Sequence, residues 1–202
     1  MRQLVRAIAA ISVLVGLFGS QQAGAGFVGM PRMLQPQLKR IAFGDQTLAP
    51  FAHTLFCIKY PAECVPHRIV FRGGPIALTA ERRDELLEVN AQINGSIAPK
   101  RSTEGAGKAW LVSPKTGDCN DYAVTKRHEL LARGWPSRAL LLAEVITTSG
   151  EHHLVLVVRT REGDIVADNL FQDIKLWNRT RYQWIRIQSP RTPAFWSNLT
   201  PA

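Results

Sequence analysis

The chain has 202 residues and a formal net charge of +9, because 25 lysines and arginines outnumber 16 acidic residues. This length suits one domain with a core of its own. The basic residues are scattered and do not form a stripe interleaved with aromatic residues, which argues against a nucleic-acid-binding protein. We expect the charge to favour solubility and a loose attraction to anionic envelope surfaces.

Residues 1–25 have the pattern of a secretory signal peptide. Arg2 and Arg6 make the start basic, the following stretch is mostly apolar, and Ala23 and Ala25 supply small residues for a cleavage site. The apolar run is shorter than the roughly 20 residues that a membrane-spanning helix needs, and no later segment is long and apolar enough. The sequence therefore predicts an exported protein, periplasmic or secreted, whose mature chain has no transmembrane segment.

Residues 26–77 are expected to form an N-terminal arm. Its first half has no clear period, and residues 52–58 could form either a strand or a short helix. Cys57 and Cys64 bracket a turn that contains proline, and in an oxidising compartment we expect them to form a disulfide that contributes about 2–3 kcal/mol. Cys119 is then left over, and an odd thiol in an exported protein is either a reactive group or an intermolecular partner.

The next predicted element is a helix that begins after Thr79 and ends before Pro99. Thr79 is a good N-cap residue. Apolar side chains then recur at spacings of three and four, at Leu86, Val89, Ile93 and Ile97. A polar, glycine-bearing loop follows at residues 100–108. We expect the folded core to span residues 78–202.

A second helix is predicted from Cys119 to Arg133. Gly117 interrupts the preceding segment, Asp118 is a good N-cap residue, and Asp121 stands at the capping-box position. Cys119 therefore lies in the first helical turn, where unpaired N–H groups and the helix dipole favour an anion such as a thiolate. We interpret Cys119 as a nucleophile that attacks a carbonyl group. The alternative is a small, buried apolar side chain.

The second half of the chain is rich in predicted strands, at residues 139–146, 153–158, 165–167 and 182–187. Short turns between successive strands predict antiparallel hairpins. Helices in the first half and strands in the second indicate an α+β fold, in which N-terminal helices pack on a C-terminal antiparallel sheet.

A cysteine nucleophile needs a base, and the base needs a group that holds its tautomer. His153 begins one predicted strand and Asp168 ends the next. A tight hairpin centred near Thr160-Arg161 would place their side chains opposite or diagonal to each other. The alternative is that His153 and Asp168 have unrelated structural roles.

Two other histidines compete for the role of base. Adjacent strand residues point to opposite faces, so only one of His152 and His153 can meet the cysteine, and the hairpin register favours His153. His128 lies about 13 Å along the helix from the cysteine, which is too far for a base.

Three motifs of the chain occur together, in this order, in a known family. They are Gly117-Asp118-Cys119-Asn120-Asp121-Tyr122-Ala123 with Lys126, then His153-Leu154-Val155-Leu156, then Ala167-Asp168-Asn169-Leu170. With them, the stretch from Leu78 to Gln188 resembles the bacterial transglutaminase-like cysteine proteinase family. The resemblance implies a papain/transglutaminase-like fold and a Cys-His-Asp triad, whose motif positions fall on Cys119, His153 and Asp168.

The resemblance also implies a function and a partner. Better-known relatives are periplasmic proteases that clip surface adhesins, which implies a cysteine endopeptidase acting on an envelope or cell-surface protein. Relatives that bind calcium near the nucleophile place acids on both sides of the cysteine, whereas this chain has Asp118 but Asn120. We therefore expect that no cofactor is required, and the sequence argues against the calcium that such relatives bind.

Two other functions fit the same residues. A transglutaminase or amidase acting on envelope proteins or peptidoglycan shares the chemistry as far as the acyl-enzyme, and differs in whether water or an amine attacks it. A non-enzymatic envelope-binding module would keep the fold without turnover. Labelling of the cysteine and incorporation of a labelled amine would separate these functions.

Overall fold

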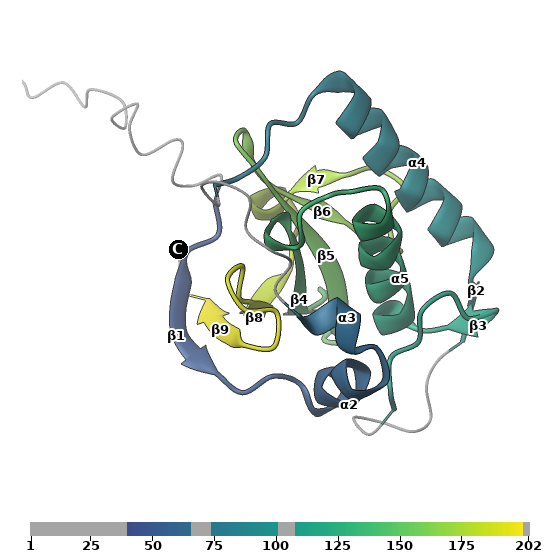
Figure 1. The fold of residues 1–202 in the computed structure, drawn as a ribbon, viewed down its shortest axis with the longest axis vertical. Coiled ribbons are helices and arrows are strands. Elements are labelled where there is room, and N and C mark those ends of the chain that lie inside the picture. The colour runs from purple at the N-terminus through teal and green to yellow at the C-terminus, as the bar shows by residue number, and fades with distance from the viewer. Residues whose placement is uncertain (1–39, 66–73, 101–107, 200–202) are drawn as a thin grey trace, which may run out of the picture. The chain divides into compact units, whose positions relative to one another are not determined.

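A seven-stranded sheet is the central element of this computed structural model, which describes residues 40–65, 74–100 and 108–199 (Figure 1). All of its strand pairs are antiparallel. In spatial order the strands are β1 (Phe43–Thr47), β9 (Trp196–Leu199), β8 (Gln183–Gln188), β4 (Leu140–Ile146), β5 (His152–Thr160), β6 (Gly163–Ala167) and β7 (Lys175–Leu176). The predicted signal peptide, residues 1–25, lies outside the described residues. Within them, no helix has the length and apolar character needed to cross a membrane.

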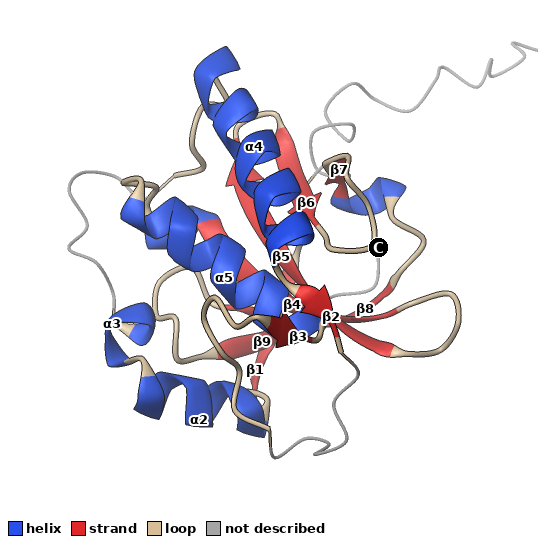
Figure 2. Cartoon of the chain, turned by 90° about the vertical axis from the view of Figure 1, so that its right-hand side faces the viewer, coloured by secondary structure: helices blue, strands red, loops and turns tan. Residues whose placement is uncertain are grey.

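Two long helices pack side by side on one face of the sheet (Figure 2). They are α4 (Ala80–Ser96) and α5 (Cys119–Ala132), and α5 contacts β4 and β5 directly. The remaining elements are α2 (Phe51–Lys59), α3 (Pro61–Cys64), the parallel pair β2 (Ala98–Pro99) and β3 (Thr116–Gly117), and the 3-10 turns Ser137–Ala139 and Trp177–Arg179. The predicted α+β class is confirmed.

The sheet carries apolar side chains on both faces. On the helix side, Leu154 and Leu156 of β5 belong to a core that also contains Leu86 of α4. On the other side, Val155 and Val157 pack in a second apolar cluster. Because side chains alternate between the faces of a strand, an unbroken apolar run is what a strand covered on both sides requires.

The β5–β6 hairpin forms, but its register differs from the expected one. The turn lies one residue later than predicted, so that Thr160 faces Gly163 and Leu156 faces Ala167. Gly163 has a φ of 141°, which favours glycine, and its carbonyl accepts a hydrogen bond from Thr160 Oγ1 at 2.6 Å. Asp168 consequently follows the last residue of β6 and does not face His153 across the ladder.

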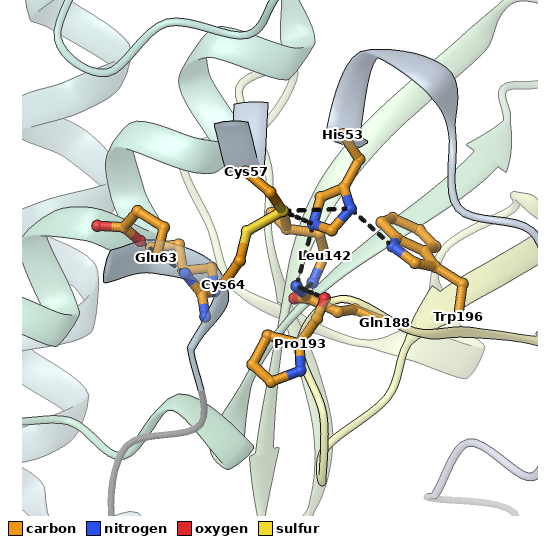
Figure 3. Close-up of a disulfide and its surroundings, with 9 residues drawn as sticks. His53, Cys57, Glu63, Cys64, Leu142, Gln188, Pro193 and Trp196 are labelled. Carbon is orange, nitrogen blue, oxygen red and sulfur yellow. Dashed lines mark hydrogen bonds and ion pairs between the residues drawn. A yellow bond between two sulfur atoms is a disulfide. The ribbon is translucent and has the colours of Figure 1, made fainter. Parts of the chain in front are cut away.

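Residues 40–64 are joined to the same sheet and core. β1 pairs with β9 at the sheet edge. Residues 51–59 form a helix, which decides between the two structures that the sequence left open. The predicted disulfide links Cys57 of α2 to Cys64 of α3 (Figure 3).

A buried histidine lies against this disulfide. His53 Nδ1 accepts a hydrogen bond from the Trp196 indole at 3.2 Å (Figure 3). Burial, together with the charge of Arg127, lowers the pKa of His53 to about 4, so the ring is neutral at pH 7. His53, Cys57 and Cys64 lie close enough to hold a metal, but the two sulfurs are bonded to each other and this group is structural.

Candidate active site

The nucleophile position is built by the capping of α5. The Asp118 side chain accepts a hydrogen bond from Asn120 N at 3.0 Å, and Asp121 Oδ2 accepts one from Asp118 N at 3.0 Å. This capping box requires Gly117, because a Cβ at that position would lie 2.6 Å from Asp121 Oδ2. Cys119 is thereby held in the first turn of α5, partly exposed and with a free thiol.

His153 lies between this thiol and a carboxylate. His153 Nε2 and Asp168 Oδ1 are 2.8 Å apart, and the two side chains are 5% and 3% exposed. The Cys119 sulfur also hydrogen-bonds the imidazole. Because Nε2 faces Asp168, Nδ1 is the ring nitrogen left for the sulfur. The structure therefore brings together the three residues that the sequence singled out.

The electrostatics of this group favour a protonated imidazole. Burial alone would lower the pKa of His153, but the hydrogen bonds to Asp168 and Cys119 raise it to about 9. Burial likewise disfavours the Asp168 carboxylate, yet hydrogen bonds, chiefly from His153, lower its pKa. The ring is therefore positively charged at neutral pH, next to a sulfur that it can stabilise as an anion.

Other residues fix the position of Asp168. Tyr182 Oη donates to Asp168 Oδ2 at 2.5 Å, and burial together with this bond raises the pKa of the phenol. Leu170 N donates to Oδ1 at 3.0 Å. From α4, the Asn94 amide donates to the Asp168 carbonyl at 3.0 Å. Tyr182 and Asn94 could not be predicted from the sequence, because nothing local relates a strand start or a helix amide to a distant carboxylate.

Two hollows, of about 440 and 450 Å³, meet at the nucleophile. Residues that line both are Cys119, Asn120, His152 and His153. Pro50, Phe51 and Trp110 line only the first, whereas Lys100, Thr147 and Leu170 line only the second. The two hollows therefore form one groove, and Cys119 lies in the wall that they share.

The two competing histidines pair with other residues. The His152 side chain is 70% exposed, and its Nδ1 lies 2.9 Å from Glu144 Oε1. His128 Nδ1 lies 2.7 Å from Glu63 Oε1. Both rings pair with glutamates outside the Cys119–His153–Asp168 group.

A lysine bridges two carboxylates beside the nucleophile. Lys108 Nζ donates to Asp118 Oδ2 at 2.9 Å and to Asp121 Oδ2 at 2.6 Å. Partial burial opposes the charged form, but these hydrogen bonds raise the pKa of Lys108. The other oxygens also accept hydrogen bonds, Asp118 Oδ1 from Asn120 and Asp121 Oδ1 from Leu111 N at 2.9 Å. The chain thus places a cation of its own between these two acids.

A comparison with protein families matches residues 43–202 to the bacterial transglutaminase-like cysteine proteinases. The chain belongs to this family. The resemblance noted in the sequence is confirmed, and the matched region extends to β1 and includes Cys119, His153 and Asp168. Comparison with curated proteins gives no match.

Solved structures of Legionella pneumophila LapG are similar to this family member. The first has 23% identity and a TM-score of 0.46, and covers 52% of this chain and 62% of the LapG chain. A calcium-bound form and an EGTA-treated form also have 23% identity and cover 52% of this chain. They have TM-scores of 0.47 and 0.46, with 63% and 61% of the LapG chain covered. This chain thus spans less than two thirds of the length of those chains.

The residues beside Cys119 in this family member do not fit a calcium ion. Calcium takes 6–8 oxygen ligands. Here every carboxylate oxygen of Asp118 and Asp121 already accepts a hydrogen bond, and Lys108 brings a positive charge into the space between them. Asn120 turns its amide nitrogen, and not an oxygen, toward Asp118 at 3.0 Å.

Proposed function

We propose that the protein is an exported cysteine endopeptidase that hydrolyses amide bonds of an envelope or cell-surface protein, such as an adhesin. Cys119 is the nucleophile, His153 is the acid and base, and Asp168 orients the ring. The observation that carries this proposal is the placement of the His153 imidazole between the Cys119 sulfur and the Asp168 carboxylate.

The reaction follows from these contacts. The Cys119 sulfur bonds to the carbonyl carbon, and the backbone N–H groups at the start of α5 stabilise the oxyanion. His153 gives its proton to the leaving amine, which departs as the C–N bond breaks and leaves a thioester. Water then attacks the thioester, giving one proton to His153, and the sulfur leaves as the acid product departs.

The shape of the groove supports an extended polypeptide as substrate. Because the groove has two parts that share Cys119, substrate residues before and after the cut bond each have a place to bind. The first hollow presents the exposed ring of Phe51 beside Pro50 and Trp110, which favours an apolar substrate side chain there.

The test is cleavage of surface proteins by the purified protein, with new N-termini identified by mass spectrometry. We expect a limited set of cuts with the wild type and none with Cys119→Ala. A labelled amine in the same reaction distinguishes transfer from hydrolysis. Equal cleavage by Cys119→Ala rules out the proposed nucleophile, and amine incorporation without cleavage identifies a transferase.

We further propose that this activity needs no calcium, because the Lys108 ammonium already occupies the place between Asp118 and Asp121. Proteolysis is expected to proceed at the same rate in EGTA and in added calcium. Lys108→Met leaves the buried Asp121 carboxylate without its counter-charge. We therefore expect this substitution to lower the free energy of unfolding by about 1–3 kcal/mol. Lys108→Arg is the charge-conserving control. Inactivation of the wild type by EGTA contradicts this proposal.

A further inference from the structure

An exposed leucine lines the second of the two hollows at the nucleophile. Leu170 is 53% exposed, and it shares this hollow with Cys119 and His153. Its backbone N–H holds Asp168 Oδ1 at 3.0 Å, but its side chain has no role in the mechanism above. A leucine exposed on an open surface is common, whereas a leucine in the wall of a groove beside a nucleophile lies where a substrate must bind.

Two asparagines of α4 hold the backbone of the loop at residues 168–172. The Asn94 amide donates to two carbonyls of this loop, at 3.0 and 3.3 Å, and the Asn90 amide donates to two, at 2.8 and 3.3 Å. Both amide oxygens are buried without a hydrogen-bond partner among the described residues. An exposed loop is usually mobile, but this one presents Leu170 from a fixed backbone. A ligand that contacts this side chain therefore loses little of its affinity to the ordering of the loop.

The charged residues around Leu170 do not favour one sign of charge in a ligand. Lys100 and Glu151 line the same hollow and have opposite charges. Asp118 lines it as well, but its Oδ2 already pairs with Lys108 Nζ at 2.9 Å. The leucine can recognise an aliphatic side chain, because contact between the two removes apolar surface of both from water.

We propose that Leu170 is a specificity-determining residue, whose side chain packs against an aliphatic side chain of the bound polypeptide in the second hollow. This inference rests on the proposed function of the same site. The first hollow has an apolar contact of its own in the exposed ring of Phe51. Because the two hollows share Cys119, Leu170 and Phe51 act on opposite sides of the cut bond.

The test is cleavage of a defined mixture of peptides by the full chain, with the products identified by mass spectrometry. For each variant, the residues at about four positions on each side of the cut bond are counted, which covers ~14 Å of extended chain in each direction. The preference at a position is a ratio between peptides cut by the same variant. A change in overall activity or stability therefore cancels.

In the wild type we expect leucine, isoleucine or valine to be preferred over aspartate at one position by roughly 10-fold or more. Leu170→Ala should reduce this ratio to about threefold or less. Leu170→Lys should invert it, so that aspartate or glutamate becomes the favoured residue there. Phe51→Ala should change the preference on the other side of the cut bond. Leu48 is 84% exposed and lines neither hollow, so Leu48→Ala is the matched control and should leave the profile unchanged.

Three results would overturn the proposal. They are a Leu170→Lys profile identical to that of the wild type, a shift at the position that Phe51→Ala changes, and an equal loss of cleavage of every peptide in Leu170→Ala. Labelling of Cys119, the free cysteine, with iodoacetamide shows in each variant that the thiol is reactive. If labelled wild type cuts no peptide, the proposed function fails and this inference fails with it. Cleavage with an unchanged profile refutes the role of Leu170 alone.

Discussion

Replacement of His153 by alanine is expected to slow alkylation of Cys119 at pH 7 by roughly 10- to 30-fold. In the proposed mechanism the imidazole, protonated up to about pH 9, stabilises the sulfur anion. Without it, the sulfur loses the hydrogen-bonded cation that favours its reactive anion. Proteolysis should fall further, by roughly 10²–10⁴, because the proton donor for the leaving amine is also lost.

The adjacent histidine provides a matched control. His152→Ala removes an exposed ring that pairs with Glu144, so labelling of Cys119 should change by less than about threefold. Equal effects of the His152 and His153 substitutions would contradict the assigned roles.

In the wild type, the rate of proteolysis and the rate of Cys119 alkylation should respond differently to high pH. As the pH rises through about 9, His153 loses its proton, so proteolysis declines because the leaving amine is no longer protonated. Alkylation needs only the sulfur anion, and it should continue without this decline. A parallel fall of both rates would indicate unfolding instead of titration, and circular dichroism at each pH distinguishes the two.

Replacement of Glu63 by alanine is expected to cost about 3–5 kcal/mol of the free energy of unfolding. Arg127 of α5 is 1% exposed, and its Nη1 donates to Glu63 Oε2 of α3 at 2.6 Å. The guanidinium also donates from Nε to the Leu140 carbonyl at 3.1 Å. Removal of Glu63 leaves this cation buried without its counter-charge, in the helix whose first turn carries Cys119.

Urea unfolding measures this effect, and His128 supplies the control. His128 contacts the same carboxylate from a more exposed position, so His128→Ala should cost less than about 1 kcal/mol. The double variant Glu63→Leu with Arg127→Met removes both charges and should recover much of the loss. A cost for Glu63→Ala no larger than that for His128→Ala would show that the pair does not stabilise the fold.

Local chemistry explains which parts of the fold were predictable. The start of α5 depends on Asp118 and Asp121, which lie within one helical turn of Cys119, so neighbouring residues specify it. The end of α5 was also predictable from the sequence, because glycine is the usual residue in the left-handed conformation that ends a helix. Gly134 follows the last turn and has a φ of 82°. β1 and β9 were not predicted, because strands that pair across more than 140 residues carry no local signal of their partner.

The amino-acid sequence by itself determined the capped helix with its free thiol, the existence of the β5–β6 hairpin and the three motifs that identify the family. These features arise from interactions within a few positions or from the motif residues themselves. Only the tertiary structure decided that Lys108 lies between the acids beside Cys119 and that Tyr182 and Asn94 hold Asp168. It also decided that Lys126 Nζ is buried without a hydrogen-bond partner among the described residues. Such contacts join distant segments, and packing of the whole sheet against α4 and α5 selects them.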